Sequence, residues 1–509
     1  MLEFVFLLKR RSSKGMIFRI GRWIDTRSAM PTASAGKAIF KATDVSISGL
    51  SFETSTAPLV SIIITAFGGL AQTLHCLRSI AANLPLVPIE LIVIEDASGD
   101  PEMAVLGSIP GLRFRALEEN LGYVRACNIG AAMARGEFLH FLNNDTAVSA
   151  GWLDAMLSLF GRPQCGAVGS RLLNADGSLQ EAGSVVSRDG SAWNFGRADH
   201  ASLSDYTYVR EVDYCSAASL LVRRDVFMAL HGFDEAFAPA YYEDTDFAFR
   251  LRERGLSSFY QPKSVIYHLE RFSHGGNPDS GTRSLLRVNQ KKFVARWGQV
   301  LAREHFNAGE FMFLARQRAA LRKIVLVVAR PKPPLDTERG SVRLLRIVEA
   351  LTEHGLLVKF WPHGAMPERP HVESLEQQGV EFFHSWRHQN QLGRWLRQNG
   401  ECIDFALLVG AAASPSMVKS IRSASAAQVL TFDGRTDLLG QGDHKDALPV
   451  DDFSKAQLWQ ILSRSIDAQP YRSIAERFDP ARMGKRALRQ GWGQAHFGAA
   501  DAMRGEPPE

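Results

Sequence analysis

Acidic side chains follow two apolar stretches of the sequence at the points where those stretches end. Residues 89–94 lead into Glu95 and Asp96, and residues 138–142 lead through two asparagines into Asp145. A carboxylate just beyond a buried strand can hold a hard cation such as Mg²⁺, and that cation can hold a diphosphate. The alternative is an ordinary turn, in which Asn and Asp bond to their own backbone. The first interpretation predicts a site for a phosphorylated ligand.

A third acidic cluster opens a predicted helix. Glu243, Asp244 and Asp246 fall in the first turn of a segment with helical spacing that ends at Gly255. Acids at this place are stabilised by the helix dipole, so the cluster has a structural explanation. It can also supply a general base that deprotonates a hydroxyl group. His268, at the end of an apolar run, is a candidate metal ligand, although a lone histidine is more often structural.

The elements that would position these groups form a strand–helix–strand–strand–helix–strand series. The predicted strands are residues 60–65, 89–94, 112–116 and 138–142, and the predicted helices are residues 70–83 and a small-residue helix that runs through Arg135. Right-handed crossovers bring the carboxyl ends of parallel strands to one edge of a sheet, where ligands bind in open α/β folds. We therefore expect the acids that follow the strands to converge. The pattern predicts an α/β fold of mononucleotide-binding type.

The middle of the chain is predicted to complete this sheet. A helix begins near Gly151, a further strand covers residues 212–222, and Asp225 is a candidate N-cap of the next helix. A last strand covers residues 265–268. The stretch 176–196 is dense in turn residues, as are loops that shape a binding pocket.

The composition is that of a well-cored globular protein. The chain has 509 residues, enough for about three domains, with 45% apolar residues and a net charge of +5. This mild basicity is not a nucleic-acid signature, so no nucleic-acid partner is expected. The five cysteines are scattered and odd in number, which predicts reduced thiols. No stretch is long and apolar enough to cross a bilayer, and we therefore expect a cytoplasmic protein.

The first predicted boundary falls at residue 57. Residues 1–31 combine seven Lys/Arg with two acids and several aromatic and aliphatic residues. This composition suits an anionic membrane surface and equally a loosely docked tail. Residues 1–57 are thus predicted to be a basic amphipathic segment and a linker, with peripheral attachment to the inner face of the cell membrane left open.

Over roughly residues 58–275 the sequence resembles the family 2 glycosyltransferases, which have the GT-A fold. The matching motifs stand in the family's order, and they are residues 60–65, Glu95-Asp96-Ala97-Ser98, Asn120-Leu121-Gly122, Asn143-Asn144-Asp145, Gly232-Phe233-Asp234-Glu235 and Glu243-Asp244-Thr245-Asp246. The Asn-Asn-Asp and Glu-Asp-x-Asp forms are most similar to the rhamnosyltransferase-like members of O-antigen and polysaccharide pathways.

The resemblance implies a donor site, a metal site and a base. Residues at the strand ends and their loops would bind a nucleotide-diphosphate sugar, and these are Thr65, Ala66, Glu95, Asp96, Asn120, Gly122, Asn128, Asn144 and Asp145. Asp145 and His268 would hold Mg²⁺ or Mn²⁺ on the diphosphate. Asp244, or less favourably Glu243, would take the proton of an acceptor hydroxyl. The implied reaction is an inverting transfer to a glycan or lipid-linked acceptor in cell-surface polysaccharide synthesis.

Several residues depart from the family pattern. Asn143 replaces the first acid of an Asp-x-Asp pair, Ala217 replaces a glycine that usually faces the acceptor, and His231 replaces the first glycine of Gly-Gly-Phe-Asp. The last two departures concern acceptor geometry more than catalysis. Asn143, together with an incomplete C-terminal half, suggests the alternative function, a nucleotide-sugar-binding subunit of a polysaccharide assembly complex with weakened catalysis. A pyrophosphorylase is less favoured because the first strand lacks a basic Gly-rich loop, and a dinucleotide oxidoreductase because no G-x-G-x-x-G follows a strand.

The last third of the chain is predicted to be a second α/β unit. Residues 276–322 form a basic helical linker, residues 323–435 a βαβ series, and residues 436–509 a helical or irregular tail. The series resembles the Rossmann-like N-terminal half of a GT-B glycosyltransferase, fused behind the GT-A domain. About 75 residues follow Phe432, too few for a second Rossmann half, so this unit is not expected to be an independent glycosyltransferase.

Overall fold

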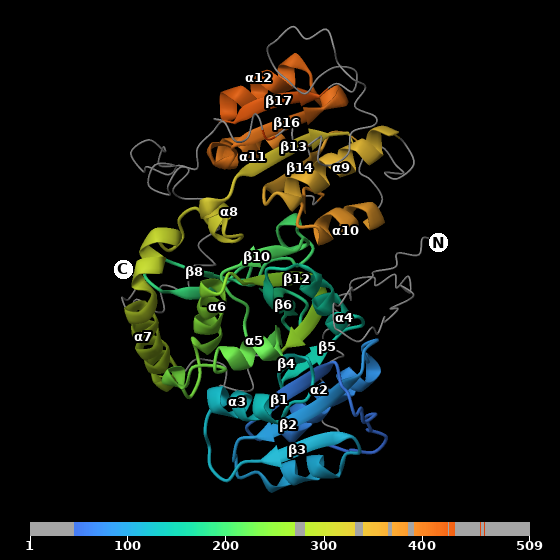
Figure 1. The fold of residues 1–509 in the computed structure, drawn as a ribbon, viewed down its shortest axis with the longest axis vertical. Helices are drawn as coiled ribbons and strands as arrows, with labels where there is room; N and C mark the ends of the chain where they lie inside the picture. Colours follow the sequence, from blue (N-terminus) through green and yellow to red (C-terminus); the bar gives the residue numbers. More distant parts are fainter. Residues whose placement is uncertain are drawn as a thin grey trace, which may run out of the picture.

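The computed structural model describes residues 45–269, 280–330, 339–364, 369–384, 391–425 and 427–432, together with residues 459 and 463. The predicted basic segment 1–31 lies outside these residues, as does nearly all of the predicted tail. Two α/β units are stacked along the long axis of the molecule (Figure 1). Within the described residues, no helix has the length and apolarity needed to span a membrane.

The first unit is built on a ten-stranded sheet. Its strand order is β10-β12-β6-β11-β4-β1-β2-β3, with β5 paired to β12 and β7 paired to β6. The strands are β1 (Val60–Ala66), β2 (Ile89–Glu95), β3 (Leu112–Ala116), β4 (Phe138–Asn143), β5 (Thr146–Val148), β6 (Cys165–Leu173), β7 (Leu179–Glu181), β10 (Arg210–Val212), β11 (Ser219–Arg223) and β12 (Ser257–His268). The pairs β1–β2, β1–β4 and β2–β3 are parallel. The predicted α/β sheet is therefore confirmed.

Helices cover both faces of this sheet. They are α2 (Leu70–Ala82), α3 (Tyr123–Met133), α4 (Trp152–Leu157), α5 (Arg224–Ala229), α6 (Glu243–Glu253) and the short turns η1 (Pro101–Ser108), η2 (Ser158–Gly161), η3 (Ser204–Tyr206) and η4 (Glu235–Phe237). A separate hairpin consists of β8 (Ser184–Val186) and β9 (Ala192–Asn194). Along β1, Ile63 packs into one core, whereas Ile62 and Ile64 pack into the other. This alternation explains why the strand is apolar throughout.

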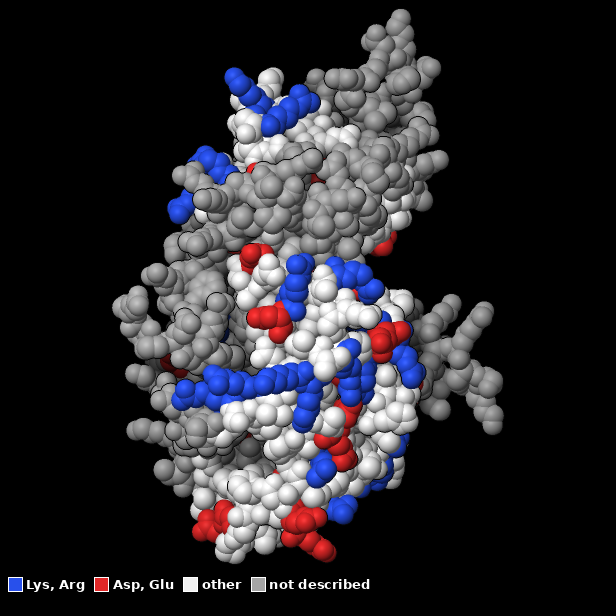
Figure 2. Space-filling model, turned by 90° about the vertical axis from the view of Figure 1, so that its left-hand side faces the viewer, with Lys and Arg blue, Asp and Glu red and all other residues white. Residues whose placement is uncertain are grey.

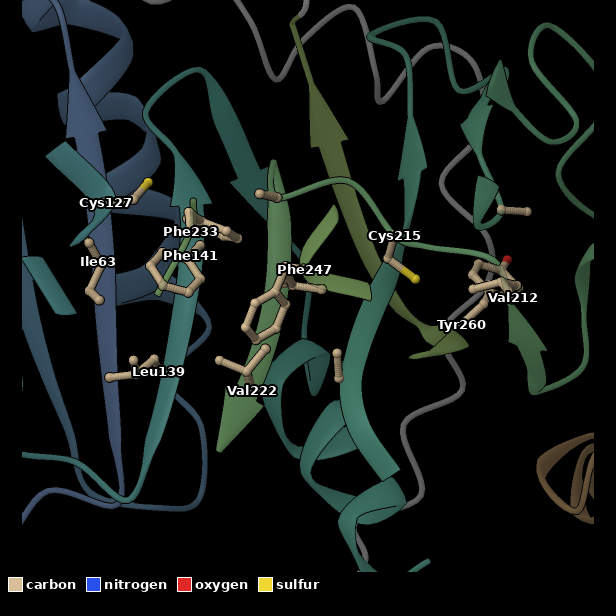
Figure 3. Close-up of a cluster of buried hydrophobic side chains, with 14 of the residues drawn as sticks. Ile63, Cys127, Leu139, Phe141, Val212, Cys215, Val222, Phe233, Phe247 and Tyr260 are labelled. Atoms are coloured by element: carbon tan, nitrogen blue, oxygen red, sulfur yellow. The ribbon is translucent and has the colours of Figure 1, made fainter. Parts of the chain in front are cut away.

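The core beneath α3 and α6 is aromatic. The rings of Phe141 and Phe233 have centroids 4.9 Å apart, and the ring of Phe247 lies 5.6 Å from that of Phe233; these side chains gather around the strands in Figure 3. Small residues let α3 come close, because a Cβ on Gly130 would lie 2.4 Å from the Ile63 side chain. The small-residue pattern of this helix is thus a packing requirement.

Three expectations for the middle of the chain are wrong in detail. The strand expected over residues 212–222 is divided into β10 and β11, because the backbone N–H groups of Ser216 and Ala217 bond to side-chain carboxylates and leave the sheet. Asp225 does not cap α5, whose N-cap is Arg223 without a side-chain bond. The final strand is also longer than expected, since β12 begins at Ser257.

The segment expected as a helical linker packs on the first unit instead. Helix α7 (Ser280–Glu304) buries Phe293, Trp297 and Leu301, and the Trp297 ring lies 5.4 Å from that of Phe249 on α6. Helix α7 lies at the left of Figure 1, on the side that Figure 2 shows, where a band of Lys and Arg side chains runs close to acidic ones. This helix is therefore part of the first unit.

The second unit is a five-stranded parallel sheet in the order β15-β14-β13-β16-β17. Its elements, with the connection that leads into it, are α8 (Met312–Ala315), η5 (Ala319–Leu321), β13 (Ile324–Ala329), α9 (Arg339–Glu353), β14 (Leu357–Pro362), α10 (Arg369–Gln377), β15 (Glu381–Phe382), α11 (Leu392–Asn399), η6 (Gly400–Cys402), β16 (Phe405–Val409), η7 (Gly410–Ala412), α12 (Pro415–Ala424) and β17 (Gln428–Phe432). In chain order this is 3-2-1-4-5, the order of a doubly wound Rossmann sheet. The strands expected from the sequence are present, and the two-residue β15 was not expected. Its assignment as half of a GT-B fold stays a prediction.

A buried ionic network joins the two units. Glu381 on β15 contacts Lys359 Nζ at 2.5 Å and Arg316 Nη2 at 2.6 Å, and all three side chains are at most 4% exposed. Arg316 also pairs with Asp205 of the first unit at 2.6 Å. Burial alone would raise the pKa of Glu381, but the charges of Arg316 and Lys359 hold it at about 2. The backbone contributes as well, since Val209 N–H donates to the carbonyl of Glu376.

We expect Glu381→Gln to destabilise the protein by about 3 kcal/mol or more, because it leaves two buried cations without their shared anion. Urea unfolding followed by tryptophan fluorescence measures this loss. Glu373→Gln is the matched control, because Glu373 pairs with Lys263 across the same interface at 3.3 Å but is 36% exposed. Such an exposed pair contributes about 0–1 kcal/mol. Equal losses in the two variants would show that the buried network has no special role.

Candidate functional site

The carboxyl ends of three parallel strands meet at one edge of the first sheet. In the register of the sheet, Ala66 of β1 stands beside Glu95 of β2, and Thr65 of β1 stands beside Asn143 of β4. The backbone N–H of Asp96 donates to the carbonyl of Ala66 at 2.8 Å. The convergence predicted for the residues that follow these strands is confirmed.

Asp145 and His268, the two predicted metal ligands, lie side by side, and the pairing of β5 with β12 explains why they meet. His268 lies opposite Thr146 in that pairing, so its ring reaches Asp145, with 3.2 Å between Nε2 and Oδ1. Gln180 Oε1 accepts a hydrogen bond from His268 Nδ1 at 2.8 Å. The Nε2 atom is therefore the one that carries the lone pair in the neutral ring.

The side chains around this pair fit a divalent cation. Asn143 Nδ2 can only donate, and it lies 3.3 Å from His268 Nε2, which confirms that Nε2 acts as an acceptor. Two acceptor atoms, Nε2 and Asp145 Oδ1, thus face each other, and a cation between them relieves their repulsion. Asn143 Oδ1 is buried with no hydrogen-bond partner among the described residues, and supplies a further oxygen donor. Imidazole and oxygen donors suit Mn²⁺ or Mg²⁺.

The protein donors do not complete the coordination shell. No group of three or more His, Cys, Asp and Glu residues that could hold a metal occurs within the described part of the chain. Mg²⁺-type sites commonly use one or two carboxylates, with water and substrate phosphates completing the shell. The predicted ligand pair is therefore brought together, in a form that leaves most coordination positions for a ligand.

Glu95 and Asp96 shape the loops around the strand ends. The two oxygens of Asp96 accept from the backbone N–H groups of Leu121 and Gly122, each at 2.8 Å. Glu95 Oε1 accepts from the N–H groups of Gly68 and Ser98 at 3.3 and 3.0 Å. Burial raises the pKa of Asp96. These acids thus hold the loops, and their contact with a nucleotide sugar stays a prediction.

Three asparagines predicted to contact the donor also bond to the protein. Asn128 donates to the carbonyl of Phe233 at 2.8 Å and accepts from its N–H at 2.9 Å. Asn144 Nδ2 donates to Thr73 Oγ1 on α2 at 3.0 Å, and Asn120 Oδ1 accepts from Gly122 N–H at 3.1 Å. Their contacts position loops on the rim of the site.

The candidate bases lie at the start of α6. Asp244 accepts from the N–H of Ala217 at 3.2 Å and from the N–H of Thr245 at 2.6 Å. Glu243 is 5% exposed, and its Oε2 has no hydrogen-bond partner among the described residues. The two carboxyls therefore differ in how well their charge is supported.

Burial and mutual repulsion separate their ionisation. Burial, followed by the charge of Asp244, raises the pKa of Glu243 well above its usual range. Burial also raises the pKa of Asp244, but its bonds from Ala217 and Thr245 oppose that rise. Glu243 therefore keeps its proton up to a higher pH than Asp244 does. An ionised carboxylate with a raised pKa is suited to act as a general base.

Asp246 has a structural role. It is fully buried and receives hydrogen bonds from Arg250 at 2.6 Å, Arg296 at 2.7 Å and the Trp297 indole at 2.9 Å. These bonds tie α6 to α7. The spacing of the three acids in the sequence does not distinguish this anchor from the base.

Sequence reasoning missed two neighbouring residues of the site, both on β7. Gln180 orients the metal-facing histidine, and Glu181 Oε1 accepts from the N–H of Ser216 at 3.1 Å, one residue before Ala217. Burial, followed by the charge of Asp244, raises the pKa of Glu181 to about 7. Only the turn density around residues 176–196 pointed to this region.

The family model "Glycosyl transferase family 2" matches residues 61–227. The chain contains a family 2 glycosyltransferase domain. The match spans the strand-end loops and the proposed metal aspartate, and it ends within α5, before the acidic start of α6.

Curated relatives agree with this assignment. An O-antigen biosynthesis protein RfbC of Myxococcus xanthus is 32% identical over 42% of this chain and 18% of its own length. An N-acetylglucosaminyl-diphospho-decaprenol L-rhamnosyltransferase of Mycobacterium tuberculosis is 29% identical over 38% of this chain and 70% of its own length. The chain spans about a third or less of the curated relatives with which it shares 30% identity or more.

A solved structure of GalNAc-T7 with UDP, GalNAc and Mn²⁺ aligns with a TM-score of 0.40 and 14% identity over 49% of this chain and 50% of that chain.

Gly122, in the loop between β3 and α3, packs against the loop that precedes α6. Its φ is +81°, and a Cβ there would lie 2.4 Å from Pro239 Cβ and 2.7 Å from Pro239 Cα. The N–H of Val124 also donates to the Pro239 carbonyl at 3.1 Å. The two loops are thus in direct contact, and only glycine fits between them.

We expect Gly122→Ala to lower stability by about 2 kcal/mol or more, because backbone strain and a clash with the Pro239 backbone add. The matched control is Gly151→Ala, where φ is +71° and nothing lies within 4 Å of the added Cβ. The control carries only the strain of an ordinary left-handed residue, about 1 kcal/mol, whereas Gly122, with φ of 81° and ψ of 163°, lies in a region that is essentially restricted to glycine. Thermal unfolding of both variants measures the difference, and equal shifts would contradict the close contact.

Proposed function

We propose that this protein is a metal-dependent, inverting glycosyltransferase that moves a sugar from a nucleotide-diphosphate sugar to a hydroxyl group of a glycan or lipid-linked acceptor. The observation that carries the proposal is the connection between the metal ligands and the base. Gln180 bonds to His268, and its neighbour Glu181 accepts a hydrogen bond from the N–H of Ser216. The N–H of Ala217, which follows Ser216, donates to Asp244. The short strand β7 therefore links the proposed metal ligand His268 to the segment that binds the proposed base Asp244.

The donor is assigned to the edge of the sheet where β1, β2 and β4 end. A divalent cation held by Asp145, His268 and Asn143 would neutralise charge on the diphosphate of the leaving group. The loops held by Glu95 and Asp96 form the adjoining rim and would surround the nucleoside. The family match and the named relatives support this use of the site.

Asp244 is assigned as the base in a single displacement. Its carboxylate takes the proton of the acceptor hydroxyl as that oxygen bonds to the anomeric carbon. The bond from the anomeric carbon to the diphosphate breaks on the opposite face, so the configuration inverts and a nucleoside diphosphate leaves. Burial raises the pKa of Asp244, which makes its carboxylate a better proton acceptor than an ordinary aspartate.

The relatives favour an acceptor in cell-surface polysaccharide synthesis. Their names refer to O-antigen biosynthesis and to rhamnosyl transfer onto a diphosphate-linked lipid. We accordingly propose hexosyl or deoxyhexosyl transfer at the cytoplasmic face of the membrane. A binding subunit without catalysis is less well supported, because such a subunit has no need to keep an ionised, hydrogen-bonded Asp244.

Asp244→Asn tests the base directly. We expect nucleotide release from the best donor of a UDP-, dTDP- and GDP-sugar panel to fall by about 10³-fold, because an amide cannot accept the proton. Donor affinity should stay within a few-fold. Asp225→Asn, which alters an exposed carboxylate on α5, is the control. Joint loss of binding and turnover in Asp244→Asn would assign Asp244 a structural role instead.

The pH profile follows from the same assignment in the wild-type protein. The base must be ionised, so kcat should decline as the pH falls through the raised pKa of Asp244. The decline should therefore begin at a higher pH than an ordinary aspartate would give. A kcat that is constant down to pH 4 would exclude this base.

Metal removal is the second test of the proposed function. We expect EDTA to abolish nucleotide release, and Mn²⁺ or Mg²⁺ to restore it. In Asp145→Asn, tighter binding of UDP in the presence of Mn²⁺ should be lost, as measured by calorimetry with nucleotide alone. Metal-independent binding and turnover in the wild-type protein would contradict the assignment of Asp145 and His268.

A further inference from the structure

Asn289, in the middle of α7, holds the loop that leads into the base. It is fully buried, and its Nδ2 lies within hydrogen-bond distance of the carbonyls of Phe237, Ala240 and Tyr241, at 2.9, 3.0 and 3.0 Å, so that its two hydrogens are shared among the three oxygens. On its other side, Oδ1 accepts from Lys292 Nζ at 3.0 Å. The acceptor carbonyls and the ammonium group fix the orientation of the amide.

The loop held by Asn289 contains two consecutive residues in a conformation that side chains rarely adopt. Tyr241 has φ of 74° and Tyr242 has φ of 71°, and neither is glycine. Each left-handed residue costs about 1 kcal/mol or more and persists only where the surroundings over-determine it. Glu243 follows directly, so the strained pair sets the direction in which α6 begins.

The remaining contacts hold the same loop at other points. The Tyr242 hydroxyl donates to the Gly190 carbonyl at 2.9 Å, and Val124 N–H donates to the Pro239 carbonyl at 3.1 Å. Lys292 Nζ also donates to the Ala236 carbonyl at 2.7 Å. The loop is therefore clamped between α3 on the donor side and α7 on the other, and Asn289 makes the most bonds to it.

We propose that Asn289 is a positioning residue for the base: by binding three carbonyls of residues 237–241, it holds the strained turn that aims Asp244 at the acceptor. This inference rests on the proposed function of Asp244. It also extends the catalytic unit through α7, well beyond the segment 61–227 that matches the family.

The chemistry of the clamp argues for a role beyond packing. A buried amide inside a helix face needs partners for all its polar atoms, whereas an apolar side chain of similar size would pack there without that requirement. The bonds of Asn289 fall on the residues just before the base and on the strained Tyr241. A shift of about 1 Å in a catalytic group can cost about 10²-fold in rate, so small relaxation of this turn should be visible in kcat.

The test uses Asn289→Asp, which keeps the shape and replaces the donating Nδ2 with an oxygen that repels the three carbonyls. We expect kcat to fall by about 100-fold, with KM for the donor and the affinity for UDP within about three-fold of wild type. The matched control is Asn399→Asp, the same substitution at a buried helical asparagine of the second unit, whose Nδ2 donates to the Trp395 carbonyl at 3.2 Å. It should keep kcat.

Hydrogen exchange of the protein without ligands separates the possible failures. Amides of residues 237–244 should exchange at least ten-fold faster in Asn289→Asp and in Asn289→Ala than in the control. If wild type is active but Asn289→Asp keeps its kcat, the inference is wrong and the proposed function stands. If wild type transfers no sugar, the proposed function fails, and unchanged exchange at residues 237–244 would overturn the positioning role independently. Equal loss of thermal stability and kcat in both Asn→Asp variants would assign Asn289 to folding alone.

Discussion

The crowding of Glu181, Glu243 and Asp244 in one buried place is the constraint on which the site depends. Like charges in a low-dielectric interior cannot all ionise, and each carboxyl loses hydration as well. The pKa values of all three are therefore raised, and hydrogen bonds from the surrounding backbone oppose the rise to different extents. The break between β10 and β11 frees the N–H of Ala217 to stabilise Asp244, and that of Ser216 supports Glu181. Glu243 Oε2 has no hydrogen-bond partner among the described residues, and burial together with the charge of Asp244 raises the pKa of Glu243 well above its usual range.

This distribution of charge requires an exact direction for the first turn of α6, and two layers of contacts supply it. Asp246 anchors the helix to α7 through Arg296 and the Trp297 indole. The preceding loop rests against Gly122, whose N–H is held by Asp96 at the end of β2. Asp96 thus acts at a distance, through Gly122 and Pro239, on the placement of Asp244. The loop that follows β3 and the loop that precedes α6 are therefore in direct contact.

The sequence predicts what depends on local pattern and on the rules of parallel sheets. Apolar runs gave β1 to β4 and β13 to β17 apart from the two-residue β15, and the crossover rule brought Asp145 and Glu95 to one edge. The sequence does not predict which partners the polar groups bind, because a bond such as that from the Gly122 N–H to Asp96 depends on loop geometry. For the same reason the roles of Gln180 and Asn289 were not predicted, since each is a single polar residue whose partner is distant in the chain. Pairing of β5 with β12, which brings His268 to Asp145, likewise follows from tertiary structure alone.

The interface between the two units shows how polar burial can specify geometry. An apolar interface tolerates sliding, whereas the network of Lys359, Glu381, Arg316 and Asp205 satisfies its charges in only one arrangement. Desolvation offsets most of the Coulomb attraction of such a network, so its net contribution to stability is small even though loss of one member is costly. Its effect is therefore on orientation. The backbone bond from Val209 to Glu376 lies next to edge strand β10, and the second unit thereby covers an edge that would otherwise be open to pairing. The C-terminal unit is thus built as a fixed extension of the glycosyltransferase domain, since a freely moving domain would have to expose these charges and this edge.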